Sequence, residues 1–180
     1  MSGTFNEIDV PPTLVSFAVD MAKRGEIVTP ELKAAGNKLV RFEVEKDEFD
    51  IPVYDQAAHL YAGIHELTSD GTILSAYALD AKGAAAALSK MAFGNKLGVV
   101  IGEEVTRNDL FENALGDILA ELPADRLALL EEKELDYKVI GTVAGDPAFV
   151  YGGVRIELEE ALAAWTSRLE KVYPTKAVKD

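Results

Sequence analysis

Short apolar segments with the two-residue alternation of a β-strand are separated along this chain by segments with helical spacing, and this limits the fold most. Val40, Phe42 and Val44 alternate with charged residues, which predicts a half-buried strand with an exposed polar face. Apolar residues at helical spacing then predict a helix over 54–68. Strands separated by helices form a sheet covered by helices, so we expect an α/β or α+β fold with a mixed sheet.

The same patterns predict the other elements. Gly152 and Gly153 separate two short apolar runs, which predicts a two-residue hairpin turn between strands at 149–151 and 154–156. A last helix carries an apolar stripe that we expect to face the core, with Leu158, Leu162, Trp165, Leu169 and Val172. The remaining strands are expected at 13–19, 73–79, 97–101, 118–122 and 138–143, and the remaining helices at 84–93, 110–115 (a short helix or turn) and 125–133.

The composition excludes several classes of protein. The chain of 180 residues has a net charge of −13, which repels a phosphate backbone and argues against nucleic acid as a partner. It has no cysteine, so disulfides and thiolate metal sites are excluded, and a reducing, cytoplasmic location is expected. No apolar run approaches the ~20 residues of a membrane span, and residues 1–7 do not resemble a secretion signal.

The first candidate site is the turn Asp80–Gly83, between a predicted strand and a helix that begins with Ala84–Ala87. The start of a helix presents free N–H groups and a positive dipole end, which favour a phosphate. Lys82 would add a full charge, and Gly83 would let a ligand approach the backbone. The simpler alternative is that Asp80 caps the helix and Lys82 is solvated.

The second candidate site is the N-terminal segment, which is small, polar and without periodicity. Its hydroxyls and backbone N–H groups could surround a ligand, with Ser2, Gly3, Thr4 and Asn6 as the contacts. The alternative is a disordered terminus. A small molecule that carries phosphate is the ligand expected at both candidate sites.

No catalytic or metal-binding constellation stands out beside these. The two histidines, His59 and His65, lie six residues apart on one predicted helix and therefore do not form the i, i+4 pair of a zinc helix. Adjacent carboxylates on a helix point in different directions, so we expect the acidic pairs to be solvated: Glu103-Glu104, Glu131-Glu132 and Glu159-Glu160.

Several stretches in order along the chain together resemble the phosphoribosylformylglycinamidine synthase (PurL) family of purine biosynthesis, in particular its C-terminal-type AIR synthase-related domain in the second copy. In the long form of that enzyme, a G-G-K-D-S-M-S run precedes this kind of segment, and this chain opens on its last two letters. The stretches that carry the resemblance are Met1–Ala18 (MSGTFNEIDVPPTLVSFA), Ser89–Gly98 (SKMAFGNKLG), Gly116–Pro123 (GDILAELP), Val139–Val143 (VIGTV) and Leu158–Trp165 (LEEALAAW) with Leu169.

This resemblance implies an α/β sandwich like the C-terminal domain of AIR synthase (PurM), over residues 1–173, with 174–180 as a linker or frayed tail. The full enzyme converts formylglycinamide ribonucleotide (FGAR) to its amidine with ATP, magnesium and glutamine. The chain would then be an excised domain, inactive alone. It would form a nucleotide or phosphate cleft with an N-type AIR synthase domain of the same polypeptide, and a glutaminase domain would follow it.

The turn at Asp80 departs from the family pattern. The family loop often reads H-D-x-S-[DE]-G-G-L, or glycine-lysine-glycine-glycine in a subgroup, and Ala81 and Ala84 stand where that shorter version has glycines. The lysine and one glycine remain, so the charge is kept while the phosphate cradle is weakened. Two alternatives stay open: a stand-alone binding or interaction module of the same fold, including a homodimer, and a relative such as AIR synthase or thiamine phosphate kinase.

Overall fold

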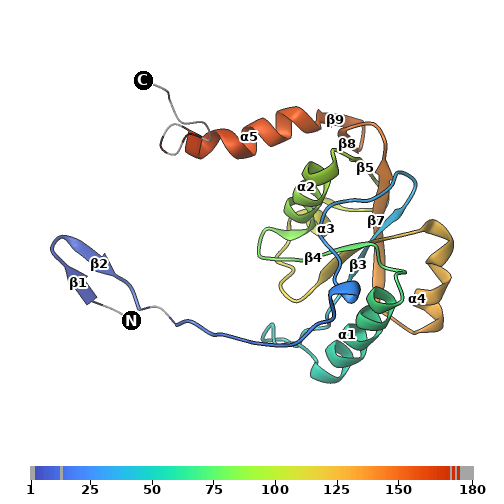
Figure 1. The fold of residues 1–180 in the computed structure, drawn as a ribbon, viewed down its shortest axis with the longest axis horizontal. Coiled ribbons are helices and arrows are strands. Elements are labelled where there is room, and N and C mark those ends of the chain that lie inside the picture. The colour runs from blue at the N-terminus through green and yellow to red at the C-terminus, as the bar shows by residue number, and fades with distance from the viewer. Residues whose placement is uncertain (1–2, 13, 171, 173, 175–180) are drawn as a thin grey trace.

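The computed structural model describes residues 3–12, 14–170, 172 and 174. Its centre is a seven-stranded mixed sheet in the order β4-β6-β3-β7-β5-β8-β9 (Figure 1). The strands are β3 (Lys38–Phe42), β4 (Ser75–Ala78), β5 (Gly98–Ile101), β6 (Ile118–Leu122), β7 (Tyr137–Ala144), β8 (Ala148–Tyr151) and β9 (Val154–Glu157). Neighbouring strands are antiparallel except β5 and β8, which are parallel. The expected mixed sheet is confirmed.

Helices cover the two faces of this sheet. They are α1 (Tyr54–Ser69), α2 (Gly83–Asn95), α3 (Arg107–Phe111), α4 (Ala128–Glu132) and α5 (Leu158–Glu170), with 3₁₀ turns at Arg24–Glu26 and Ala124–Arg126. One buried cluster joins α2 and α3 to Leu39 and Leu119, and the other joins α1 and α4 to Val40 and Phe42. Among the described residues, no helix has both the length and the apolar character required to cross a membrane.

The central strand β3 is buried on both faces, which corrects one sequence prediction. Alternation of Val40 and Phe42 with Arg41 predicted a polar, exposed face, but the Arg41 side chain is only 5% exposed. The reason is that α3 and the loop 112–117 cover this face of the sheet at the end of β3. Alternation showed that the residue faces away from Phe42, whereas its exposure depended on a loop about 70 residues further along.

The N-terminal part projects from the body as an arm (Figure 1). A small hairpin pairs β1 (Gly3–Phe5) with β2 (Ile8–Val10), and an extended segment follows it. The strand predicted at 13–19 is wrong for residues 14–19, and Thr13 lies outside the described residues. No described strand pairs with this segment, and its apolar side chains are exposed, Leu14 and Val19 by 95% and 96%.

The hairpin at the far end of the sheet is confirmed, whereas the last helix differs from its prediction. Gly152 and Gly153 both have positive φ, 56° and 82°, as a tight hairpin turn requires. Helix α5 begins at the buried Leu158 and then projects beyond the body (Figure 1), so that Trp165 is 59% exposed instead of buried. The Leu169 side chain and residues 175–180 of the expected tail lie outside the described residues.

Candidate functional site

The turn between β4 and α2 is closed by its own polar groups. The Asp80 carboxylate accepts a hydrogen bond of 2.7 Å from the Lys82 N–H, and the Asp80 carbonyl accepts one of 3.0 Å from the Gly83 N–H. Asp80 is therefore occupied in shaping the turn, and Lys82 stands directly before the first helical residue.

Gly83 is required by packing inside the protein. Its φ is +71°, and a Cβ at this position would lie 2.7 Å from the carbonyl oxygens of both Leu110 and Glu112. Any other side chain would clash with the end of α3 and adopt a strained backbone conformation. The position of Gly83 therefore fixes the start of α2 against α3.

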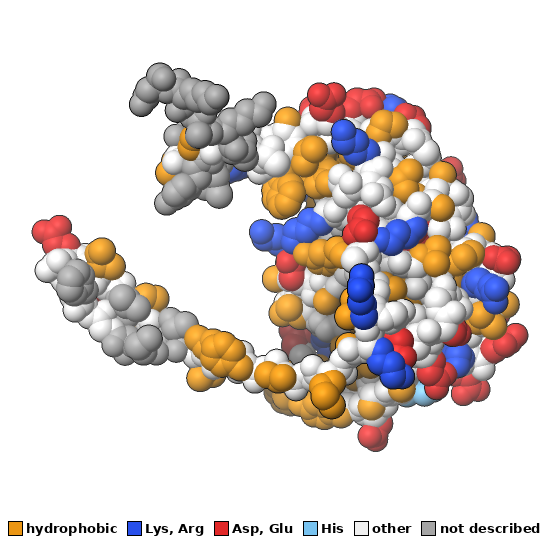
Figure 2. All heavy atoms as spheres, viewed as in Figure 1, with side chains coloured by type: hydrophobic (Ala, Val, Ile, Leu, Met, Phe, Trp, Pro, Cys, Tyr) orange, Lys and Arg blue, Asp and Glu red, His pale blue; other side chains and the backbone are white. Residues whose placement is uncertain are grey.

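Lys82 is exposed, and within the described part of the chain its ammonium group has no ion pair. It borders a hollow of about 240 Å³ between α2 and α5, which Lys90, Ser89, Phe93 and Trp165 also line. Figure 2 shows basic side chains beside apolar ones over this part of the body. A free cation directly before the start of α2 thus lies next to an open hollow, an arrangement that suits a phosphate group.

The N-terminal candidates lie on the hairpin of the projecting arm. Gly3 and Thr4 belong to β1, and Asn6, with φ of 53°, lies in the turn. The Thr4 hydroxyl donates a hydrogen bond of 2.8 Å to the Asp9 carboxylate. Ser2 lies outside the described residues. The hairpin stands well apart from the start of α2, so the structure does not bring the two candidate segments together (Figure 1).

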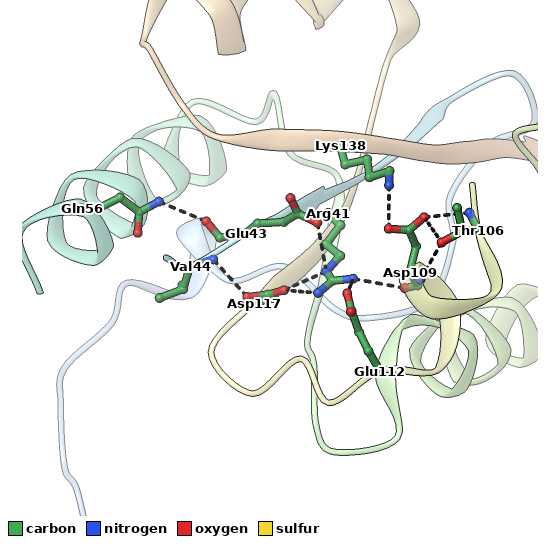
Figure 3. A network of polar contacts seen from close by, with 9 residues as sticks. All are labelled: Arg41, Glu43, Val44, Gln56, Thr106, Asp109, Glu112, Asp117 and Lys138. Carbon is green, nitrogen blue, oxygen red and sulfur yellow. Dashed lines mark hydrogen bonds and ion pairs between the residues drawn. The ribbon is translucent and has the colours of Figure 1, made fainter. Parts of the chain in front are cut away.

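A buried ion network that the sequence did not indicate is centred on Arg41 and reaches α3 and Asp117 (Figure 3). Arg41 Nε and Nη2 each lie 2.7 Å from the Asp117 carboxylate, and Arg41 Nη1 lies 2.7 Å from Glu112 Oε1. Nη1 also donates to the carbonyl oxygen of Asp109 at 3.1 Å. Asp117 accepts a further hydrogen bond from the Val44 N–H.

The network holds the end of α3 in place, and α3 in turn contacts Gly83. Arg41 bonds to the Asp109 carbonyl and to the Glu112 side chain, and the carbonyls that pack on Gly83 are those of Leu110 and of Glu112 itself. Burial acts to lower the pKa of Arg41, but the carboxylates of Glu112 and Asp117 outweigh it and raise the pKa. Arg41 is therefore charged, and it positions the β4–α2 turn indirectly, by holding the end of α3 that packs on Gly83.

A second pair extends the network along α3. Lys138 Nζ lies 2.5 Å from Asp109 Oδ1, and the other carboxylate oxygen accepts from the backbone and hydroxyl of Thr106. Burial acts to raise the pKa of Asp109, but the hydrogen bonds from Lys138 and Thr106 outweigh it and bring that pKa to about 2. Asp109 is therefore ionised, and both of its carboxylate oxygens accept hydrogen bonds.

Beside Arg41 lies an acidic hollow of about 490 Å³, lined among others by Glu43, Glu45, Asp50 and Asp136. Burial raises the pKa of Glu43, an effect that Arg41 only partly offsets. Among the described residues, no group of His, Asp and Glu side chains is arranged to hold a metal ion.

Comparison with solved structures identifies the fold. No protein-family model matches the sequence. Thermotoga maritima PurL, solved in complex with ATP, matches 77% of this chain with a TM-score of 0.62 and 16% sequence identity. The PurLQS structure from the same organism matches 79% with a TM-score of 0.62 and 17% identity. A HypE–HypF complex matches 72% with a TM-score of 0.53 and 14% identity.

This chain has the AIR synthase-related fold. The sequence resemblance and the structural matches agree on it, although identities of 14–17% establish the fold alone. The chain spans 28% of the length of the PurL chains that it matches here and 54% of the HypE–HypF match. T. maritima PurL has also been solved with AMPPCP, ADP and FGAR.

Proposed function

We propose that this chain acts as a C-terminal-type AIR synthase-related domain, the second copy, of a phosphoribosylformylglycinamidine synthase. It would take part in the ATP-dependent conversion of FGAR to its amidine in purine biosynthesis, in the cytoplasm. Residues 1–173 would form the domain and 174–180 the linker that follows. The observation that carries the proposal is the fold shared with PurL, solved with ATP, over 77% of this chain.

The part assigned to this domain is to bind and orient a phosphate group. The start of α2 supplies backbone N–H groups and the positive end of a 13-residue helix, and Lys82 supplies a charge that no described group neutralises. ATP, when bound, supplies the phosphoryl group that activates the FGAR amide oxygen. Asp80 and Gly83 shape the turn, and Gly3, Thr4 and Asn6 of the arm would contact a ligand only when a partner domain brings them to it.

The partners in this proposal are an N-type AIR synthase domain and a glutaminase domain. Exposed apolar side chains on the arm, Leu14, Phe17 and Met21 among them, support a partner that covers this segment. Residues 1–180 alone would be inactive in amidine synthesis, because in this proposal the cleft is completed by the N-type domain and ammonia comes from the glutaminase domain. Alternatively, a second copy of this chain covers the same side chains. The molar mass in solution distinguishes this homodimer from a monomer that awaits a partner domain.

Calorimetric titration of ATP and of FGAR tests the phosphate site. We expect Lys82→Gln to weaken binding about tenfold, which is the loss of one charge-assisted hydrogen bond of about 1.4 kcal/mol at a partly exposed site. Lys96→Gln, at the opposite end of the same helix, is the matched control and should bind as the parent does. Equal affinity of the two variants would remove Lys82 from the site.

A further inference from the structure

The hollow between α2 and α5 combines positive charge with an exposed aromatic surface. The hollow is lined by Lys82, directly before α2, by four residues of α2 and by two of α5: Ala86, Ser89, Lys90 and Phe93, and Ala161 and Trp165. In a chain with net charge −13, two lysines at one hollow are a local source of attraction for an anion.

The aromatic part of this hollow is held in place and remains open. The rings of Trp165 and Phe93 are stacked, with centroids 5.5 Å apart and planes inclined by 18°. Phe93 thus supports one side of the indole, and Trp165 is nevertheless 59% exposed. A supported and exposed indole is a surface on which a flat ring can stack, and each such contact with a base stabilises a complex by about 1–3 kcal/mol.

The second cation is oriented by β4. Lys90 Nζ donates a hydrogen bond of 2.6 Å to the Tyr77 hydroxyl and lies 5.0 Å from the centroid of that ring. No carboxylate of the described residues lies within ion-pair distance of Lys90, so its two other N–H groups are available to a ligand. The interaction with Tyr77 lowers the entropy that Lys90 would lose on binding.

We propose that this hollow binds a nucleoside phosphate, with the base stacked on Trp165 and the phosphate between Lys82 and Lys90. The inference rests on the proposed phosphate site at Lys82 and extends it by naming Trp165 as the residue that recognises the base and Lys90 as the second cation. The hollow of about 240 Å³ is large enough for the base or the phosphate of such a ligand, while the remainder faces solvent. The Ser89 hydroxyl also lines the hollow, but its proton is donated to the Ala85 carbonyl oxygen at 2.8 Å, so it offers a ligand an acceptor only.

The single tryptophan of the chain makes the proposal directly measurable. ADP and ribose 5-phosphate are titrated without magnesium while the Trp165 fluorescence is recorded, and affinities are measured by calorimetry. We expect ADP to quench the fluorescence to saturation and ribose 5-phosphate to bind without this quenching. Trp165→Leu should lower the affinity for ADP about tenfold and leave the affinity for ribose 5-phosphate unchanged. Trp165→Phe should retain part of the affinity for ADP that Trp165→Leu loses.

The charged variants separate this inference from the proposed function. Lys90→Gln should lower the affinity for both ligands about tenfold, whereas Lys96→Gln should leave both affinities unchanged. The inference is overturned if ADP and ribose 5-phosphate bind equally and Trp165→Leu changes neither, while a loss with Lys82→Gln would still support the phosphate site. If neither ligand binds, the inference and the phosphate site both fail. Circular dichroism of each variant confirms that it is folded.

Discussion

At the scale of single residues, Arg41 decides how the candidate turn is held. It is a buried charge whose guanidinium bonds to Asp117, Glu112 and the Asp109 carbonyl, and these residues position the end of α3. Among the described residues, no buried side-chain polar atom is left without a hydrogen-bond partner. Removal of Arg41 would leave the Asp117 carboxylate, which is 4% exposed, without its cation, whereas the Glu112 carboxylate is 45% exposed and would be solvated.

Substitution of Arg41 should therefore lower the free energy of unfolding strongly. We expect a loss of about 3–5 kcal/mol for Arg41→Ala, because the buried Asp117 carboxylate loses its positive partner and keeps only the hydrogen bond from the Val44 N–H. Arg41→Lys keeps the charge but not the two-pronged geometry and should lose about 1–3 kcal/mol. Urea denaturation measures both changes.

Arg155→Lys is the matched control. Arg155 also bonds to two carboxylates, those of Asp146 and Glu157, but its side chain is 44% exposed. Exposed ion pairs contribute only about 0–1 kcal/mol, so the control should change stability little. Similar losses for the lysine variants at positions 41 and 155 would contradict the importance of burial in the Arg41 network.

The sequence could predict the turn at Asp80–Gly83 but not the network behind it. The turn is local, since glycine, aspartate and the start of an alanine run lie within a few residues. The Arg41 network joins residues about 70 positions apart, and no local pattern contains that information. Trp165 was expected in the core for the same reason: helical spacing defines a stripe, whereas the neighbours of the stripe are set by the tertiary structure.

At the scale of elements, the start of α3 combines a capping box with an ion pair. The Thr106 hydroxyl accepts from the Asp109 N–H, and the Asp109 carboxylate accepts from the Thr106 N–H. Lys138 of β7 bonds to the other oxygen of the same carboxylate, so that one side chain caps the helix and connects it to the sheet. A five-residue helix has few hydrogen bonds of its own and depends on such contacts.

The free energy of unfolding should consequently fall in acid, and part of this fall should come from protonation of Asp109. The pKa of Asp109 is about 2 in the folded chain, below the ordinary value of 3.8, so its contribution is complete above about pH 4 and is lost as pH falls through about 2. We expect Asp109→Asn to reduce the free energy of unfolding at pH 6 by about 2 kcal/mol. The difference from the parent should shrink toward zero near pH 2.

Urea denaturation at several pH values measures this effect. Hydrogen bonds from Lys33 and Thr29 lower the pKa of Glu31 to about 2, so Glu31 titrates in the same range. Because Glu31 is present in both proteins, its contribution cancels in the difference. Asp146→Asn is the control, because Asp146 bonds to Arg155 at an exposed site. A difference between parent and Asp109→Asn that stays constant from pH 6 to pH 2 would contradict the assigned role.

The predicted elements agree with the structure where the pattern is local and long enough. The strand 118–122 and the helix 54–68 are found within a residue of their predicted bounds, as is the hairpin around Gly152. The short helix expected at 110–115 lies at 107–111, and the Thr106–Asp109 spacing contained the capping box that marks its start. The order of strands in the sheet depends on contacts between distant residues and could not be predicted from these patterns.

At the scale of the whole molecule, the arm and the body differ in their exposure to solvent. The segment 14–23 is extended and exposed and leads into the body through the 3₁₀ turn Arg24–Glu26, whereas the helices and strands that follow surround two buried clusters. A protease binds its substrate in an extended conformation, so the exposed segment is the preferred site of cleavage.

Limited digestion with trypsin should therefore cut first after Lys23 or Arg24. The remaining body should stay folded, and bonds after residues within α2 and β7, such as Lys90 and Lys138, should be cut only after it unfolds. Mass spectrometry of a time course identifies the fragments. Cleavage after Lys23 or Arg24 that is no faster than cleavage after Lys90 would mean that the arm is packed in solution, as in the homodimer alternative.

The position of β3 in the sheet also governs how the chain can fold. Lys38 at its start pairs with Leu122 of β6 on one side and with Thr142 of β7 on the other, so both neighbours of this strand are synthesised long after it. The entropy of closing such long loops must be overcome before the central pairing stabilises anything, which is typical of domains that fold in milliseconds to seconds. Leu39, Val40 and Phe42 remain without their sheet partners until then, so this strand of the nascent chain needs protection from aggregation.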